Sequence, residues 1–137
     1  MRGNYVPSDY VMAMRDLVDV MEENEVSRLI TIAGGSIILP EERLFGKRKL
    51  LRFVFKLMFS KVVKTKDGEL EIMAKSNLKW TALRPGFVKP KKEGNFVAHE
   101  SKLLSTSVDK LQILTFIIEC IKSDEWVGKS PLVATIK

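Results

Sequence analysis

The sequence predicts an α/β protein in which helices cover a mainly parallel sheet in three layers. A helical spacing of apolar residues over 8–24 is followed by the apolar, β-branched run 28–33, and that run stops at Gly34-Gly35. A helix, a short link, a buried strand and a glycine turn together form the αβ unit of a parallel sheet. Helical and strand patterns then continue to the end, in the order helix, helix, strand, short strand, helix, strand.

The first helix is expected to begin at Ser8 as N-cap, with Asp9 at the positive end of the helix dipole. Its apolar positions recur at helical spacing, which predicts one face toward a core: Tyr10, Met14, Leu17, Val18 and Met21. Residues 36–46 are expected to be a loop, and residues 47–59 a second helix with apolar side chains almost all round.

The middle of the chain is expected to hold a hinge at 64–68 and a third helix over 69–76, with Leu70, Met73 and Ala74 inward. Residues 79–84 read as a strand that Pro85-Gly86 closes. Residues 88–100 read as a lysine-rich loop with a short strand at 95–98. Hydroxyls at 105–107 offer an N-cap for the strongly apolar helix 108–121, and residues 132–136 form a last strand.

Composition limits the kinds of site that the chain can build. The 137 residues form one domain by length, and 23 Lys+Arg against 17 Asp+Glu give a net charge of +6, which permits anionic partners without choosing among them. One cysteine and one histidine exclude an internal disulfide and a multi-cysteine or multi-histidine metal centre. No apolar run is long enough to span a membrane and residues 1–8 hold no signal-peptide core, so a cytoplasmic protein is expected.

Four segments carry a resemblance to a known family. Residues 76–86 read Ser-Asn-Leu-Lys-Trp-Thr-Ala-Leu-Arg-Pro-Gly, and residues 26–35, 103–111 and 128–131 agree with the same family in order and spacing. The chain resembles the atypical short-chain dehydrogenases/reductases of the NAD(P)H-binding group, which includes NmrA-like and flavin/biliverdin reductase-like proteins. In that pattern Asn77 replaces a glycine, Lys79 replaces an acidic residue, and Glu71 falls where the helix glutamate stands.

The resemblance implies a partial Rossmann-like fold. The family holds the dinucleotide pyrophosphate on a glycine-rich turn after its first strand, and the sequence contains no Gly-x-Gly-x-x-Gly or Gly-x-x-Gly-x-x-Gly that opens a helix. The chain therefore looks like the C-terminal, truncated portion of such a domain, without about the first four strands, the glycine-rich turn and the acidic residue that holds the ribose.

The candidate cofactor-binding residues follow two predicted strands. Gly34, Gly35 and Ser36 come after the first, where small residues let a ligand approach the backbone. Pro85, Gly86 and Phe87 come after the second, in a turn that passes beside the nicotinamide in the family. A plain strand-to-loop turn is the simpler explanation for each group.

Other chemistry-bearing residues have simpler interpretations. Lys66 matches a lysine that holds ribose hydroxyls in related enzymes, but position 62 is Val62, so the Tyr-x-x-x-Lys pair of ordinary short-chain dehydrogenases is absent. A solvated basic hinge formed by Lys61, Lys64 and Lys66 explains this lysine more simply. Glu71 is expected to face the core in a structural salt bridge, Cys120 to be a small buried hydrophobe, and His99 to be a surface residue without a partner.

The functional hypothesis is an NAD(P)-binding relative of NAD(P)H-dependent reductases and epimerases, with NADP or NAD as cofactor and weak or no binding by the isolated chain. Whether the chain is an enzyme stays open, and no metal is expected. The alternative is a non-catalytic interaction module, because half of a doubly wound sheet leaves a strand edge and apolar surface uncovered. A homodimer or a sheet-completing partner would cover them. A membrane surface or partner role for residues 47–61, and nucleic-acid binding by Lys89, Lys91 and Lys92, are weaker readings.

Overall fold

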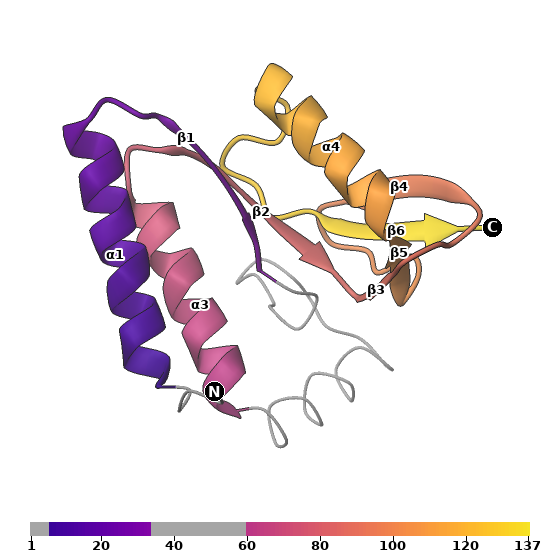
Figure 1. Cartoon of the computed structure of the whole chain (residues 1–137), viewed down its shortest axis with the longest axis horizontal. Coiled ribbons are helices and arrows are strands. Elements are labelled where there is room, and N and C mark those ends of the chain that lie inside the picture. Colours follow the sequence, from indigo (N-terminus) through magenta and orange to yellow (C-terminus); the bar gives the residue numbers. More distant parts are fainter. Residues whose placement is uncertain (1–5, 34–59) are drawn as a thin grey trace.

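The computed structural model describes residues 6–33 and 60–137, and they form helices and strands in alternation (Figure 1). The elements and their bounds are α1 (Pro7–Glu23), β1 (Arg28–Ile32), α3 (Ser60–Lys75), β2 (Lys79–Pro85), β3 (Phe87–Lys89), β4 (Asn95–His99), β5 (Ser107–Asp109), α4 (Lys110–Lys122) and β6 (Leu132–Ile136). The expected loop 36–46 and helix 47–59 lie outside the described residues.

A mainly parallel sheet is the centre of the fold. Its described strands have the order β1-β2-β6-β4, in which β1, β2 and β6 are parallel and β4 is antiparallel to β6. Leu29 pairs with Trp80 and Ile32 with Leu83, which confirms the predicted side-by-side parallel strands. The short strands β3 and β5 form a separate parallel pair beside this sheet.

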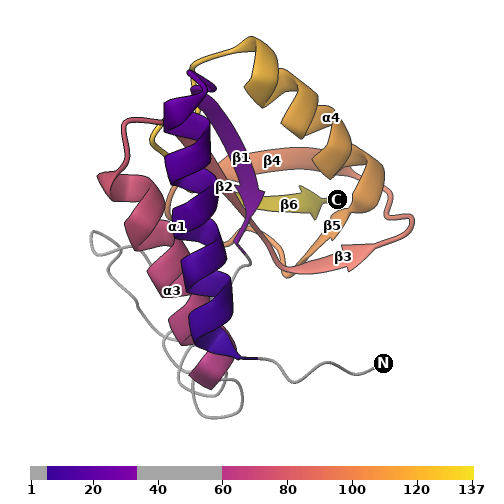
Figure 2. The same cartoon turned by 60° about the vertical axis from the view of Figure 1, so that its left-hand side comes forward.

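Helices cover both faces of the sheet, so the predicted three-layer fold class is confirmed (Figure 2). On one face α1 and α3 lie side by side and run in the same direction, opposite to β1 and β2 (Figure 1). Their core consists of Val18, Leu70 and Met73 packed on Leu29 and Ala82 of the strands. Because crossover connections between parallel strands need a helix against the sheet, this arrangement follows from the strand order.

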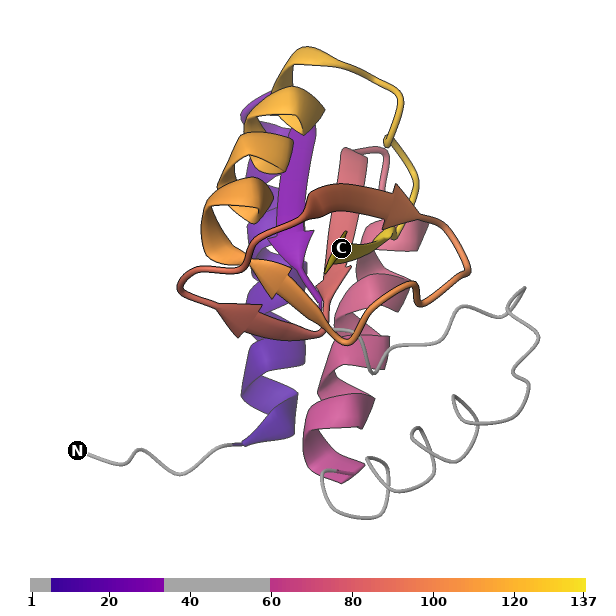
Figure 3. The same cartoon turned by 90° about the vertical axis from the view of Figure 1, so that its right-hand side faces the viewer.

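Of the described helices, α4 covers the other face (Figure 3). It buries Ile113, Phe116 and Cys120 against Leu83 and Val133 of the sheet. The ring of Phe116 lies 4.9 Å from that of Phe96 and 5.7 Å from that of Trp126, measured between centroids. Apolar residues at a spacing of three and four therefore produce the predicted late helix and its buried face.

The first helix begins two residues earlier than expected. The N-cap is Val6, which makes no side-chain hydrogen bond, and Pro7 occupies the first helical position. Proline fits there because its missing N–H has no partner inside the helix anyway. Ser8, predicted as the cap, instead donates its hydroxyl to Asp9. Tyr10 and Leu17 of the predicted inward face are exposed.

The predicted hinge at 64–68 is wrong, because these residues are inside the continuous helix α3. Gly68 explains the error, since glycine in a helix interior is unfavourable and suggests a break. In the structure a Cβ at Gly68 would lie 3.1 Å from Val11 Cγ2 of α1, so the glycine permits close packing of the two helices. Leu70 and Met73 are buried as predicted, whereas Ala74 is exposed.

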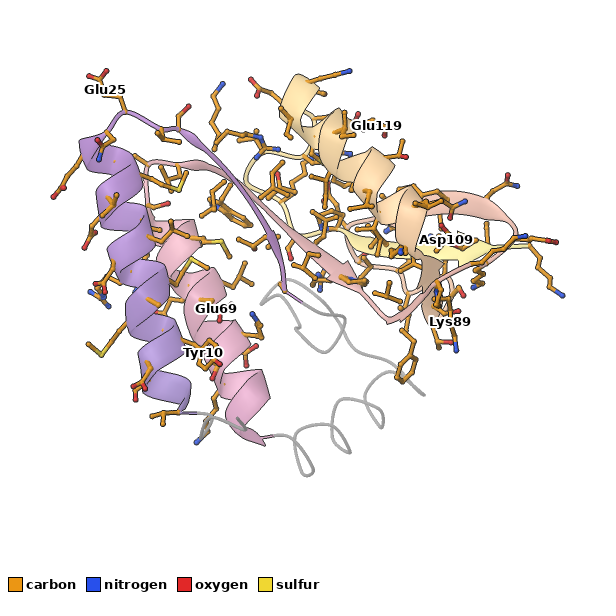
Figure 4. The ribbon with its side chains drawn as sticks, in the orientation of Figure 1. Tyr10, Glu25, Glu69, Lys89, Asp109 and Glu119 are labelled. Atoms are coloured by element: carbon orange, nitrogen blue, oxygen red, sulfur yellow. The ribbon has the colours of Figure 1, made fainter. Side chains whose placement is uncertain are left out.

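The late helix is capped by Asp109 and not by the hydroxyls at 105–107. Its carboxylate accepts hydrogen bonds from the backbone N–H groups of Leu111 and Gln112, and a third from the N–H of Lys92 at 2.7 Å. Residues 107–109 are the strand β5, so the helix starts later than its apolar pattern. Figure 4 shows Asp109 where β5 meets α4. These N–H donors, with that of Lys92 first, lower the pKa of Asp109.

This cap gives a testable pH dependence. A carboxyl group whose folded pKa lies below its unfolded value of about 3.9 stabilises the fold above that pH, and the contribution is lost as the pH falls through the folded pKa. The Asp109→Asn variant keeps a capping side chain without the charge. We expect the wild-type chain to be the more stable at pH 6, and the difference in urea midpoint to shrink below about pH 4. A difference that stays constant from pH 6 to pH 3 would contradict this role.

Candidate functional site

The carboxyl ends of β1 and β2 meet at one edge of the sheet (Figure 1). The two strands run in register to Ile32 and Leu83, and the N–H of Ala33 donates to the carbonyl of Leu83 at 2.7 Å. In open α/β sheets this edge is where ligands bind. Of the two predicted residue groups, the structure describes the one after β2; Gly34, Gly35 and Ser36 lie outside the described residues.

The turn after β2 depends on Gly86. A Cβ added there would lie 2.2 Å from the backbone oxygen of Thr106, so no larger residue fits this turn without moving the backbone. Pro85 before it is buried and pairs with Val133, which makes it the end of the strand rather than an accessible surface. Close packing against the chain at Thr106 therefore fixes where β2 ends and β3 begins.

Phe87 presents its ring, and not its amide, to solvent. Its backbone N–H donates to the carbonyl of Thr106 at 2.8 Å, so that amide is already paired. The residue is 66% exposed although it directly follows a fully buried strand segment. A large aromatic ring at the carboxyl end of a central strand can stack on a planar ligand. The exposed ring and the glycine before it are features of this edge that a ligand can reach.

Buried Arg84 holds the end of β2 in place. It is fully buried, and its Nε donates to the carbonyl of Ser130 and its Nη2 to that of Glu100, both at 2.6 Å. Ser130 in turn donates its hydroxyl to the carbonyl of Ala82. These bonds tie three segments together beneath the turn. Arg84 belongs to the segment that carries the family resemblance, but no feature of the sequence indicates that its guanidinium is buried.

Lys66 lies in the N-terminal half of α3, at the same end of the molecule as the strand ends (Figure 1). Its Nζ is 2.7 Å from Oε2 of Glu69, a nearly buried carboxylate one turn further along the helix. Lys66 is thus paired and partly buried, so the reading as a solvated hinge is wrong. Figure 4 shows Glu69 on α3 and Tyr10 on the neighbouring helix α1. No contact between Lys66 and the turn after β2 is seen in the described residues.

Two other residues singled out in the sequence, Glu71 and Cys120, have structural roles. Glu71 is exposed and pairs with Lys75, so the predicted salt bridge is confirmed and the predicted core-facing position is wrong. The hydrogen bond from Lys75 lowers the pKa of Glu71. Cys120 is fully buried as expected, and burial raises the pKa of its thiol, which keeps it protonated and a poor nucleophile.

His99 ends the strand β4 and is not isolated. Its Nδ1 accepts hydrogen bonds from the backbone N–H groups of Ser101 and Lys102, both at 3.1 Å, and the residue is half-buried. The expected surface histidine without a partner is therefore wrong. The ring nitrogen stabilises the turn of the chain after β4. The surrounding lysine-rich sequence does not indicate this hydrogen-bonded turn.

Arg28 connects the helix α4 to the sheet. Its guanidinium donates to the carbonyls of Cys120 and Lys79 and to the hydroxyl of Thr81, at 2.6–3.0 Å. The C-terminal turn of α4 is thereby held on the first residues of β1 and β2. The basic residue before the apolar run, part of the family resemblance, is thus a structural bridge between helix and sheet.

The site therefore offers backbone shape and an aromatic ring instead of a cluster of catalytic groups. Among residues 6–33 and 60–137, no group of three or more His, Cys, Asp or Glu side chains could hold a metal ion. The helices within the same ranges are too short or too polar to cross a membrane. Such an edge can bind and orient a planar ligand, while the chemistry comes from the ligand itself.

Comparisons with known proteins show the family and the fold of the chain. The model of the NAD(P)H-binding family matches residues 3–124. No curated protein matches the chain. A solved structure of ChuY from Escherichia coli is similar with a TM-score of 0.74 and 17% identity, over 93% of this chain and 63% of that one.

Two further solved structures have the same fold. One is described as an anaerobilin reductase, ChuY from Escherichia coli O157:H7, with a TM-score of 0.72, 17% identity and coverage of 93% and 60%. The other is a short-chain dehydrogenase/reductase from Veillonella parvula in complex with NADP, with a TM-score of 0.68, 15% identity and coverage of 90% and 58%. The chain thus spans about three fifths of the length of the structures it matches.

Proposed function

The chain belongs to the NAD(P)H-binding family, and from this premise we propose that it contributes the nicotinamide side of a dinucleotide site. In this proposal the turn after β2 and the residues Gly34, Gly35 and Ser36 face the cofactor. The observation that carries it is the exposed ring of Phe87 at the carboxyl end of a central parallel strand. A similar structure from Veillonella parvula is a complex with NADP, which supports a nicotinamide cofactor.

The proposed cofactor is NADP or NAD, and the proposed reaction class is the hydride transfer of reductases and epimerases. The cofactor would supply the hydride, and this chain would position the nicotinamide ring beside a substrate. Lys66 stays a weak candidate for a ribose contact, because its ammonium is already paired with Glu69. The exposed Phe87 ring and the compact Gly86 turn fit the flat nicotinamide end of the cofactor.

The residues present fit the pyrophosphate of the cofactor less well than they fit its nicotinamide end. The sequence holds no glycine-rich phosphate-binding motif, and carboxylates occupy the N-terminal ends of two described helices, Asp9 at α1 and Asp109 at α4. A helix N-terminus binds phosphate through free N–H groups and positive potential. Either carboxylate repels the anion, and that of Asp109 also accepts hydrogen bonds from the N–H groups of Leu111 and Gln112. We therefore propose that the chain by itself binds the dinucleotide weakly or not at all.

Calorimetric titration with NADPH tests this proposal. We expect a dissociation constant weaker than about 1 mM for the chain alone, equivalent to about −4 kcal/mol or less of binding free energy. The Phe87→Ala variant is expected to lose whatever affinity remains, while the exposed Arg15→Ala variant on α1 should bind like wild type. A micromolar dissociation constant would overturn the proposed weakness of binding. A measurable affinity of wild type that Phe87→Ala leaves unchanged would overturn the proposed site.

A second candidate function is a non-catalytic interaction module. The observation that favours it is the end of the sheet, because no strand of the described residues pairs with the outer edge of β1. An open strand edge presents unpaired N–H and C=O groups to a further strand. Under this candidate the chain associates with another polypeptide, and its association is independent of NADPH. Sedimentation with and without NADPH separates the two candidates.

A further inference from the structure

The strand β3 is unusually exposed for a strand in parallel pairing. Its three residues, Phe87, Val88 and Lys89, are all exposed, although β3 pairs in parallel with β5. Parallel strands are normally covered on both faces. β3 lies on the side of β5 away from α4, so no helix of the described residues covers it (Figure 2, Figure 3). The strand that continues from the carboxyl end of β2 therefore presents its side chains to solvent.

One face of β3 combines an aromatic ring with a free cation. Side chains alternate along a strand, so Phe87 and Lys89 lie on the same face, with their Cα atoms about 7 Å apart. Within residues 6–33 and 60–137, the ammonium of Lys89 makes no hydrogen bond or ion pair. Figure 4 shows Lys89 on the side of the β3–β5 pair away from α4. An apolar surface and a positive charge thus lie side by side on one short strand.

Lys92 holds the neighbouring strand in place. Its Nζ donates to the hydroxyls of Ser105 and Ser107 and to the carbonyls of Ser107 and Thr135, at 2.6–3.1 Å. Ser107 is the register partner of Phe87, so these bonds fix β5 to β6 next to the position of the ring. The ammonium of Lys92 is therefore used inside the fold, and β3 is paired with a strand that is itself well anchored.

The charges on the two strands favour an anionic ligand. Lys89 is the one charged residue of β3. Its register partner, Asp109, is nearly buried, and the Asp109 carboxylate accepts hydrogen bonds from three backbone N–H groups. The ammonium of Lys92 is bonded to uncharged oxygens. A carboxylate that approaches Lys89 therefore meets no exposed acidic side chain on β3 or β5.

We propose that this face of β3 holds the substrate, and that the substrate is an apolar carboxylic acid. Its apolar body packs on the Phe87 ring, and its carboxylate pairs with the Lys89 ammonium. The proposed nicotinamide lies at the turn 85–87, and Lys89 is farther from the end of β2, where it contacts the substrate rather than the cofactor. Lys89 is thus the residue that selects an acid. This inference rests on the proposed nicotinamide site and names the substrate class that the site takes.

Two matched probes test the substrate class. One is 1-pyrenebutyric acid, an apolar carboxylic acid with a fluorescent ring, and the other is its neutral alcohol, 1-pyrenebutanol. Fluorescence anisotropy of each probe, measured with increasing amounts of the full chain, gives the two dissociation constants. Lys89→Gln is expected to weaken binding of the acid by a factor of about three to five, the contribution of an exposed ion pair, and to leave the alcohol unchanged. Phe87→Leu is expected to weaken both probes by about the same factor.

The neighbouring lysine provides the control. Lys91 is also exposed and makes no hydrogen bond or ion pair with the described residues, but it lies beyond the end of β3. Lys91→Gln should bind the acid like wild type, and Lys89→Arg, which keeps the charge, should do the same. Equal losses in Lys89→Gln and Lys91→Gln would overturn the proposal. A loss that affects the acid and the alcohol alike in Lys89→Gln, or a wild-type chain that does not bind the acid, would overturn it as well.

The outcome is distinguishable from that of the proposed function, because neither probe contains a nicotinamide and no cofactor is added. A chain that binds reduced nicotinamide mononucleotide at the turn 85–87, but binds the acid equally well with and without Lys89, has the proposed cofactor site and not the proposed substrate class. Binding of the acid that depends on Lys89, in a chain whose turn 85–87 does not respond to the mononucleotide, would support the acid-binding face and overturn the cofactor site.

Discussion

The Arg84→Met variant is expected to lose about 3 kcal/mol of unfolding free energy. Arg84 is fully buried and donates to the carbonyls of Ser130 and Glu100. Hydrogen bonds from a charged donor contribute roughly 1.5–3 kcal/mol each, and a buried acceptor left unpaired adds its own cost. Methionine fills much of the volume and makes none of these bonds. Urea unfolding monitored by tryptophan fluorescence measures the loss.

Two further variants make the result specific. Arg84→Lys keeps the charge but not the planar fork that reaches both carbonyls, so we expect it to lose nearly as much stability as Arg84→Met. The exposed Arg15→Met on α1 should change the unfolding free energy by less than about 0.5 kcal/mol. An Arg84→Met chain as stable as wild type would show that the buried guanidinium contributes no net stability, as happens for some buried charges.

The Gly86→Ala variant is expected to lose about 2–3 kcal/mol, because the new Cβ would lie 2.2 Å from the Thr106 oxygen. Both groups belong to the backbone or are fixed to it, so no side chain can rotate away, and overpacking of this kind costs roughly 1–3 kcal/mol or more. The same shift would move Phe87 away from the end of β2. Thermal unfolding checks the loss of stability, and NADPH titration checks the loss of the site.

A second glycine serves as the control. Gly128 has φ +70° and no atom within 4 Å of its would-be Cβ. Gly128→Ala should therefore lower the unfolding free energy only by the penalty of placing alanine in the left-handed conformation, about 1 kcal/mol. Gly86→Ala should therefore be the more damaging of the two. The reverse order would contradict the close approach of the turn to Thr106.

The strands and the late helix were predictable from the sequence because each contains many apolar residues at a regular spacing. Residues 28–33 and 132–136 are short apolar runs bounded by turn residues, and the structure forms β1 and β6 there. The apolar spacing in residues 108–121 likewise predicted α4 and the burial of Cys120. In each case the burial of apolar side chains decides the structure, and the sequence records that burial directly.

Helix ends and helix continuity were predicted less well because they depend on contacts between distant segments. Gly68 reads as a hinge until Val11 of the neighbouring helix is placed against it. Asp109 caps α4 together with the N–H of Lys92, which is 17 residues away in the chain. Local sequence propensity contains no information about such a distant partner. The prediction therefore placed the cap at the hydroxyls of residues 105–107.

The end of the strand that carries the candidate site was predictable from the sequence, but the contacts around it were not. Pro85-Gly86 marked the end of β2, and β2 pairs with β1 in the mainly parallel sheet that was predicted. The burial of Arg84 and the pairing of Lys66 with Glu69 could not be foreseen, because arginine and lysine are normally exposed. The pairing of the Phe87 amide with Thr106 likewise depends on a contact across 19 residues.

The proposed nicotinamide site at the carboxyl end of β2 is tested most directly by amide chemical shifts. Titration of the isotope-labelled chain with reduced nicotinamide mononucleotide is expected to shift the signals of Gly86, Phe87 and Val88 most. Adenosine 2′,5′-bisphosphate, the other half of NADPH, should leave those signals in place. Shifts confined to other segments, or larger shifts at this turn with the adenosine half, would contradict the account.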